Sequence, residues 1–165
     1  MHSRVKNLVN GAMLAALIAA ATMALRLPLP QQRGYCSLGD SVILLSFALP
    51  PVWAAGAAAA GSVLSDVLLG SAAYAPATAL IKGVMGWIAG KWLGTQKTPG
   101  RRLLSMALTE GWMTAGYFLF EWAAFGIAAA GFGLPGNAVQ AALSIGLALL
   151  MQKPLERIHK MMKTR

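Results

Sequence analysis

The chain has 165 residues, of which 57% are apolar and 12% are charged, and its mean hydropathy is +0.60. A soluble domain has roughly 25% charged residues, so this composition excludes a water-facing globular surface and indicates an integral membrane protein. The single Cys36 excludes an internal disulfide and a multi-cysteine metal site, whereas the net charge of +9 raises nucleic-acid binding as an alternative.

Six apolar segments follow one another along the chain, and at this length they predict one all-α membrane domain over residues 1–165. The segments cover residues 7–27, 38–50, 52–70, 74–93, 103–130 and 134–151. A full span needs roughly 20 residues. The second segment, which stops at Pro50-Pro51, is therefore expected to be tilted, kinked or partly re-entrant.

The basic residues indicate the orientation of this six-helix bundle. Six spans place eleven of them on one side, in the N-terminal region, between segments four and five, and in the tail 153–165. The positive-inside rule makes that side cytoplasmic, with both termini inside and the loop "RGYCSLGD" outside. The charge is thus a topology signal, and no nucleic-acid partner is expected. The tail is either a basic amphipathic stretch on the inner leaflet or merely solvated.

Small residues form a stripe on the first segment. Ala12, Ala16 and Ala20 repeat every four residues and so lie on one helix face. Helices in lipid associate by close packing across small side chains. The stripe is therefore either an internal packing surface or a docking face for a separate membrane subunit. The stretch "AAGAAAAG" in segment three is expected to pack inside the bundle.

Asp66, Lys82, Glu110 and Glu121 all fall inside predicted spans. Each would cost roughly 3 kcal/mol if it faced lipid, so each should be paired or face a cavity. An Asp66–Lys82 ion pair is the favoured prediction, and the alternative is that Lys82 reaches a ligand. Glu110 lies nearer the cytoplasmic end and is interpreted as a structural or interface residue.

Polar and aromatic residues also gather toward the outer ends of several segments. An aromatic-lined cavity with a few placed polar groups suits a small heterocyclic ligand. The candidate substrate-binding residues are Tyr35, Asp40, Lys82, Tyr117, Glu121, Trp122, Asn137 and Gln140. We expect no catalytic residue, metal or cofactor, because both histidines are terminal and "GVMGWIAGKW" lacks the glycine and hydroxyl of a phosphate loop.

The motifs "GYCSLGDSVILL", "SDVLLG" and "YAPATALIKGVMG" together resemble the substrate-binding S component of energy-coupling factor (ECF) vitamin transporters. The resemblance is greatest to the group that includes hydroxymethylpyrimidine-type S components and is often labelled riboflavin-type. It covers residues 12–92 well and the last two spans loosely. It implies a multi-pass protein of a bacterial cell membrane that is not itself an enzyme.

The resemblance also implies partners and a site. The ligand would lie near the outer face beneath the loop at residues 34–40, and the stripe of Ala12, Ala16 and Ala20 would contact a transmembrane coupling subunit. Two cytosolic ATPases would complete the importer, and the S component would topple in the membrane to deliver its vitamin. Gly34 and Gly39 are expected to be the flexible ends of a gate.

Two functions of other classes stay open. One is a stand-alone carrier with Glu121, Asp66 and Lys82 as a relay, although no inverted repeat is evident. The other is a structural membrane protein that binds no small molecule. For an S component, a carboxylate at Glu121 suits a ring that is cationic or donates hydrogen bonds, such as hydroxymethylpyrimidine or a pyridoxine-like compound. A neutral, hydrogen-bonded role of Glu121 fits other vitamins equally well.

Overall fold

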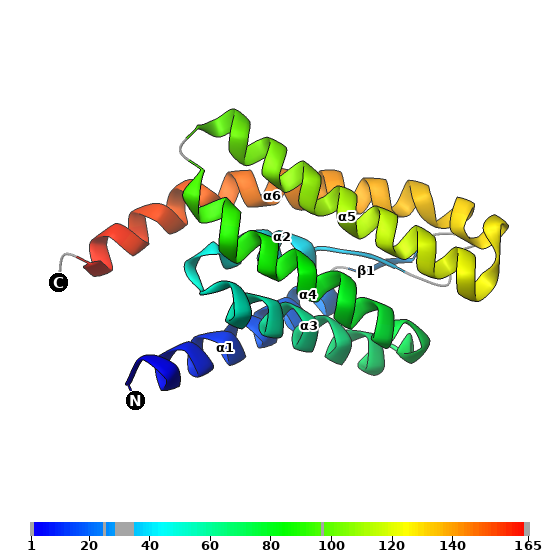
Figure 1. Cartoon of the computed structure of the whole chain (residues 1–165), viewed down its shortest axis with the longest axis horizontal. Coiled ribbons are helices and arrows are strands. Elements are labelled where there is room, and N and C mark those ends of the chain that lie inside the picture. The colour runs from blue at the N-terminus through cyan, green and yellow to red at the C-terminus, as the bar shows by residue number, and fades with distance from the viewer. Residues whose placement is uncertain (1, 25, 29–34, 97, 164–165) are drawn as a thin grey trace.

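The computed structural model describes residues 2–24, 26–28, 35–96 and 98–163, without the side chains of residues 2, 26–28, 35, 36, 153 and 155–163. In this part of the chain there are six α-helices and one short antiparallel ribbon, as Figure 1 shows. The helices are α1 (His2–Ala24), α2 (Gly39–Leu44), α3 (Pro51–Leu68), α4 (Ala75–Trp92), α5 (Pro99–Phe125) and α6 (Ile127–Lys163). The ribbon pairs β1 (Arg26–Pro28) with β2 (Tyr35–Ser37), and three 3-10 turns complete the chain: η1 (Ser46–Ala48), η2 (Ala72–Tyr74) and η3 (Leu93–Thr95).

The predicted six-helix membrane bundle is confirmed. Three of the described helices, α1, α3 and α6, are long and apolar enough to cross a membrane. The long helices α4 and α5 carry charged residues in their interiors, which lowers their hydropathy. The second segment is short and broken, as its length predicted, because α2 gives way to η1 after six residues.

The predicted boundary between segments five and six is wrong. Helix α5 ends at Phe125, and Gly126 adopts a φ of 91° before α6 begins at Ile127. Glycine reaches this left-handed region without a steric penalty and commonly ends a helix. The sequence "GFGLPG" reads as a loop, yet Pro135 lies inside α6. Membrane helices tolerate Gly and Pro because neighbouring helices compensate for the lost backbone bonds.

Helix α3 packs between α1 and α4 through its small residues, so the expectation that "AAGAAAAG" lies inside the bundle is confirmed. A Cβ added to Gly61 of α3 would lie 3.0 Å from the Cβ of Ile18, and one added to Gly86 of α4 would lie 2.8 Å from the Cβ of Ala58. These separations are below ordinary contact, so only glycine permits the observed approach of the helices. The packing partners are α1 and α4, with little contribution from the short α2.

The stripe on α1 lies outside this packing. Ala12, Ala16 and Ala20 are exposed on the surface of the bundle. Gly11, which precedes this stripe by one residue, faces α3 instead, because a Cβ added to it would lie 3.6 Å from the ring of Trp53. Of the two predicted uses of the stripe, internal packing is therefore wrong for this chain by itself.

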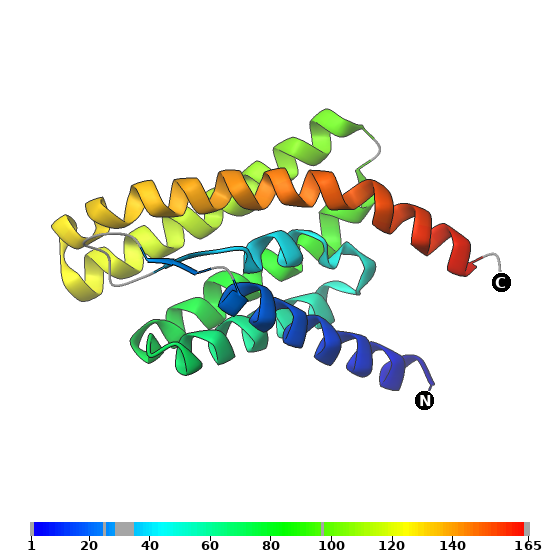
Figure 2. The same ribbon diagram turned by 180° about the vertical axis from the view of Figure 1, so that it is seen from behind.

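The bundle has two distinct ends. Figure 1 and Figure 2 show both termini and the α4–α5 connection at one end, with the α3–α4 and α5–α6 connections at the other. Helix α5 packs against α4 and α6, and α2 sits in the interior against α1, α4 and α6. The backbone of the predicted tail is a continuation of α6 as far as Lys163.

Candidate functional site

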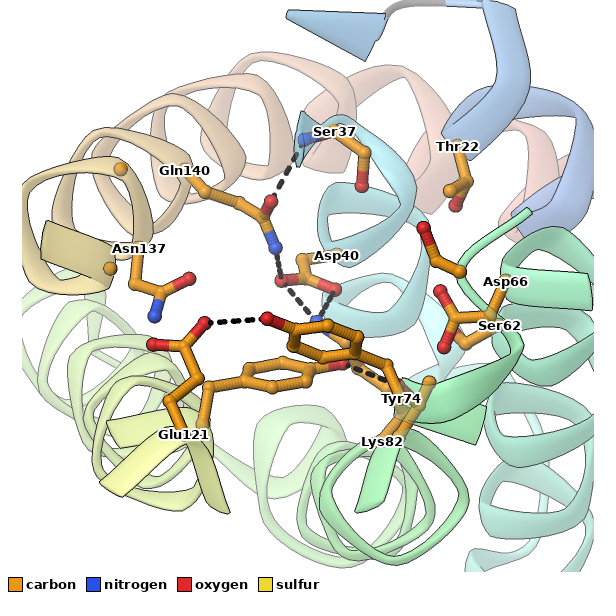
Figure 3. Close-up of a pocket in the computed structure, with 15 residues that line it drawn as sticks. Thr22, Ser37, Asp40, Ser62, Asp66, Tyr74, Lys82, Glu121, Asn137 and Gln140 are labelled. Carbon is orange, nitrogen blue, oxygen red and sulfur yellow. Dashed lines mark hydrogen bonds and ion pairs between the residues drawn. The ribbon is translucent and has the colours of Figure 1, made fainter. Parts of the chain in front are cut away.

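A polar cavity lies among the helices, and the close-up in Figure 3 shows the side chains that line it. Its lining includes Ser71 and Tyr74 of the α3–α4 connection, which Figure 1 places at the end opposite the termini. Its volume is about 60 Å³. All six helices and β2 contribute to its wall, so that residues far apart in the sequence converge. The lining residues are Thr22, Ser37, Asp40, Ser62, Asp66, Ser71, Tyr74, Thr78, Lys82, Tyr117, Glu121, Gly133, Gly136, Asn137 and Gln140.

A buried ion pair forms one wall. The Nζ atom of Lys82 donates to both carboxylate oxygens of Asp40, at 2.6 Å and 2.7 Å, and the two side chains are only 6% and 2% exposed. The predicted Asp66–Lys82 pair is therefore wrong in its acidic partner. Asp40 takes that place because α2 is inserted into the bundle interior and carries Asp40 in its first turn.

Gln140 on α6 extends this wall to the ribbon. Its Nε2 donates to Asp40 Oδ2 at 2.6 Å, and its Oε1 accepts the backbone N–H of Ser37 at 2.8 Å. One amide thereby joins α6, α2 and β2, and Figure 3 shows it lying between its two partners.

The opposite wall combines a carboxylate with two tyrosines. The hydroxyl of Tyr74 donates to Glu121 Oε1 at 3.3 Å, and the hydroxyls of Thr78 and Tyr117 are 3.0 Å apart. Within the described residues Glu121 Oε2 has no hydrogen-bond partner. It lies against Gly133, where any side chain would collide with the carboxylate. This wall therefore offers aromatic surface together with an unused acceptor.

The structure brings together six of the eight predicted site residues: Asp40, Lys82, Tyr117, Glu121, Asn137 and Gln140. Trp122 lies outside the group, because it is 53% exposed and its ring packs against Phe118 at a centroid distance of 6.4 Å. One residue after Glu121, it is rotated about 100° around the helix and faces away. Tyr35 lies in β2, but its side chain is outside the described residues.

The expectations for two glycines and for Glu110 have different outcomes. Gly39 begins α2 and is buried against Thr22, with which an added Cβ would collide, so it is a packing residue and not a flexible hinge. Gly34 is outside the described residues. Glu110 is 1% exposed, which excludes it from an external interface. Its position between buried Met106 and Met113 on α5 turns it into the bundle.

The sequence contained a signal for residues that were not predicted. Tyr74, Thr78 and Lys82 follow one another at intervals of four, so they line one face of α4 and its preceding turn. Thr22 and Ser62 are single hydroxyl residues in apolar helices, and only packing of those helices shows that they reach the cavity.

The arrangement is suited to binding a small molecule. No group of three or more His, Cys, Asp or Glu within the described residues is placed to hold a metal ion. Fixed donors, acceptors and aromatic faces surround a chamber among membrane helices, which is the composition of a site for a small polar molecule.

Comparison with known proteins places the chain in a family. The family described as "ECF-type riboflavin transporter, S component" matches residues 2–157. The chain is also 32% identical over 141 residues to a Pyrococcus woesei protein described as "Uncharacterized protein in gap 3'region", a match that covers 82% of this chain and 95% of the relative. The chain is therefore a multi-pass membrane protein that belongs to the riboflavin-type family of ECF transporter S components, which are substrate-binding subunits of importers and not enzymes.

Proposed function

We propose that the cavity binds a small water-soluble vitamin or vitamin precursor from the extracellular side. The observation that carries this proposal is a polar, partly charged chamber enclosed by helices whose outer surfaces are apolar. Polar residues at membrane depth are costly unless they serve a function or are paired. Here polar residues from six helices face one shared space.

The charges in the wall support a proposal for the ligand class. Lys82 is neutralised by Asp40 and has no remaining role as a partner for an anion. Glu121 retains an unused oxygen on the opposite wall. A neutral or cationic ring with hydrogen-bond donors therefore fits better than a carboxylate or a phosphate ester. This class includes hydroxymethylpyrimidine and pyridoxine-like compounds.

The tyrosines support a flat ring. Tyr74 and Tyr117 lie with their ring centroids 6.4 Å apart and an interplanar angle of 47°, so both bound the same part of the cavity. Aromatic side chains stack favourably with heterocycles, in addition to the area that they bury. Asn137 lines the cavity beside Glu121 and supplies both a donor and an acceptor.

The exposed stripe on α1 supports delivery through partners. Ala12, Ala16 and Ala20 present small side chains to the outside of the bundle, which permits close approach of another membrane helix. We propose that a transmembrane coupling subunit docks here and that two cytosolic ATPases supply the energy, as in the family. The end that carries both termini would then face the cytoplasm.

The test is to purify the full chain in detergent, identify copurifying small molecules by mass spectrometry, and titrate hydroxymethylpyrimidine, pyridoxine, riboflavin and pyridoxal phosphate. We expect one neutral or cationic compound to bind and the phosphate ester to bind far more weakly. Asn137→Ala should weaken that binding in a folded protein. Absence of any ligand would favour a structural role, and tightest binding of the phosphate ester would overturn the assignment of Lys82.

A stand-alone carrier is the alternative function. The Asp40–Lys82 pair disfavours it, because the ammonium that the proposed relay needs is held at 2.6 Å by a different acid. Proteoliposomes that contain only this chain should therefore show binding without accumulation. Uptake in the absence of the coupling subunit and the ATPases would instead favour a carrier.

A further inference from the structure

We infer that Gln140 is a positioning residue that holds the β1–β2 ribbon against the cavity through the Asp40–Lys82 pair, and that it does not contact the ligand. The inference deepens the proposed function, because it assigns the control of the same site. The contacts behind it exist in the ligand-free protein, however, so it can be tested separately.

The first argument is that both ends of the Gln140 amide already have protein partners. The oxygen accepts the Ser37 N–H, and the nitrogen donates to Asp40, at 2.8 Å and 2.6 Å. The side chain is only 5% exposed. A ligand would have to break one of these bonds in order to use the amide. Glu121, with its unused oxygen, offers a contact without that loss.

The second argument is that the Asp40 carboxylate is shared. It accepts from Lys82 and from Gln140 at once, so two charge-assisted bonds fix it in a buried position. In a low-dielectric interior such bonds are stronger than in water, and a broken one is costly. The ribbon is therefore held through Gln140 by a group that is itself rigidly held by α4.

The third argument is that the backbone N–H of Ser37 donates its hydrogen bond to a side chain, that of Gln140. Ser37 is paired in the ribbon with Arg26, yet its N–H is directed to Gln140 on α6. One residue after Leu38, Gly39 packs against Thr22 of α1. The end of β2 is thus held from two sides, by α1 through packing and by α6 through a hydrogen bond. Only the second contact can open without repacking a helix.

The residues that line the cavity therefore have two different roles, positioning of the ribbon and recognition of the ligand. Asp40, Lys82 and Gln140 form a positioning unit that holds the end of β2 at the wall of the cavity. Glu121 and Asn137, together with the tyrosines, are left to recognise the ligand. Loss of the unit should therefore loosen the ribbon, whereas loss of a recognition residue should leave the ribbon in place.

The test is hydrogen exchange at the Ser37 amide in the full-length, ligand-free protein in detergent. Gln140→Met removes both bonds at nearly constant size, and we expect exchange at Ser37 to rise on the order of tenfold. The double variant Asp40→Asn/Gln140→Glu exchanges the carboxylate and the amide. It restores an acceptor for Ser37 and a donor–acceptor pair between residues 40 and 140, so the rate should return close to that of the wild type.

The matched control is Asn137→Leu, which alters the cavity one helical turn before Gln140 without touching these bonds. It should weaken ligand binding and leave exchange at Ser37 unchanged. An unchanged rate in Gln140→Met would overturn the inference, as would a double variant that exchanges faster than Gln140→Glu alone. The second comparison remains decisive if Gln140→Met does not fold. Failure to find any ligand would refute the proposed function but would not alter these rates.

Discussion

The buried pair of Lys82 and Asp40 gives a large and specific prediction for stability. Lys82→Met keeps the length of the side chain but leaves the Asp40 carboxylate with Gln140 as its remaining partner among the side-chain bonds described above. Breaking a buried pair by removing one partner costs about 3–5 kcal/mol. For a chain of this size each kcal/mol lowers the melting temperature by about 2–4 °C. We therefore expect a decrease of about 10 °C.

The double variant Asp40→Asn/Lys82→Met separates loss of the pair from loss of packing. It removes both charges while residue 40 keeps an oxygen that can accept from Gln140. Replacing both ions of a buried pair is often close to neutral, so most of the lost stability should return. Lys91→Met is the matched control, because Lys91 is exposed near the end of the same helix and lies over the ring of Trp87. Its effect should be small.

The assay is thermal unfolding in detergent followed by circular dichroism, with all variants heated at one rate because membrane proteins can unfold irreversibly. The reasoning is refuted if the double variant loses as much stability as Lys82→Met and Asp40→Asn, each measured alone, lose together. It is also refuted if Lys82→Met and Lys91→Met have equal effects. In either case the ion pair would contribute nothing beyond the volume of its side chains.

The remaining predictions concern binding and transport. Glu121→Gln should weaken ligand binding by about 10–100-fold, because a hydrogen bond to a charged group contributes about 1.5–3 kcal/mol. Trp122→Ala, at an exposed position, should leave the affinity unchanged. Equal losses of affinity in the two variants, measured by calorimetry, would contradict the assigned site. Gly133→Ala should also weaken binding, because its methyl group displaces the Glu121 carboxylate, while Gly131→Ala meets open space and serves as the control. A Gly133→Ala protein with normal affinity would show that the carboxylate can move freely. Ala16→Leu should leave ligand binding unchanged and reduce uptake in cells that contain the whole importer, because the larger side chain prevents close approach of a helix at the proposed docking face. Loss of both ligand binding and uptake would indicate misfolding instead.

Much of the fold was predictable because the solvent is lipid. Long apolar runs and their lengths identified the bundle and the short second helix. The exception at Gly126 has a local cause. Both "AFGI" and "GFGLPG" contain helix-breaking residues, and the sequence does not show that neighbouring helices support Pro135 inside α6 while the chain turns at Gly126.

The charged residues of the candidate site were also predictable, because charged and polar groups in apolar segments have few acceptable environments. Asp40, Lys82, Glu121 and Gln140 were found in this way. Their pairing was not predictable. Proximity to one end of a span favoured Asp66 for Lys82, whereas the observed partner is brought in by a helix of only six residues.

The sequence by itself determined that this chain lies in a membrane and that its buried charges must meet inside the bundle. Both conclusions follow from transfer free energies, which depend on residue type and local neighbours. Only the tertiary structure decided which acid faces Lys82, that Trp122 faces outward, and that Gln140 reaches Ser37 across 103 residues of chain. Such contacts depend on how each helix is rotated and where α2 is inserted, and these are set by the packing of the whole bundle.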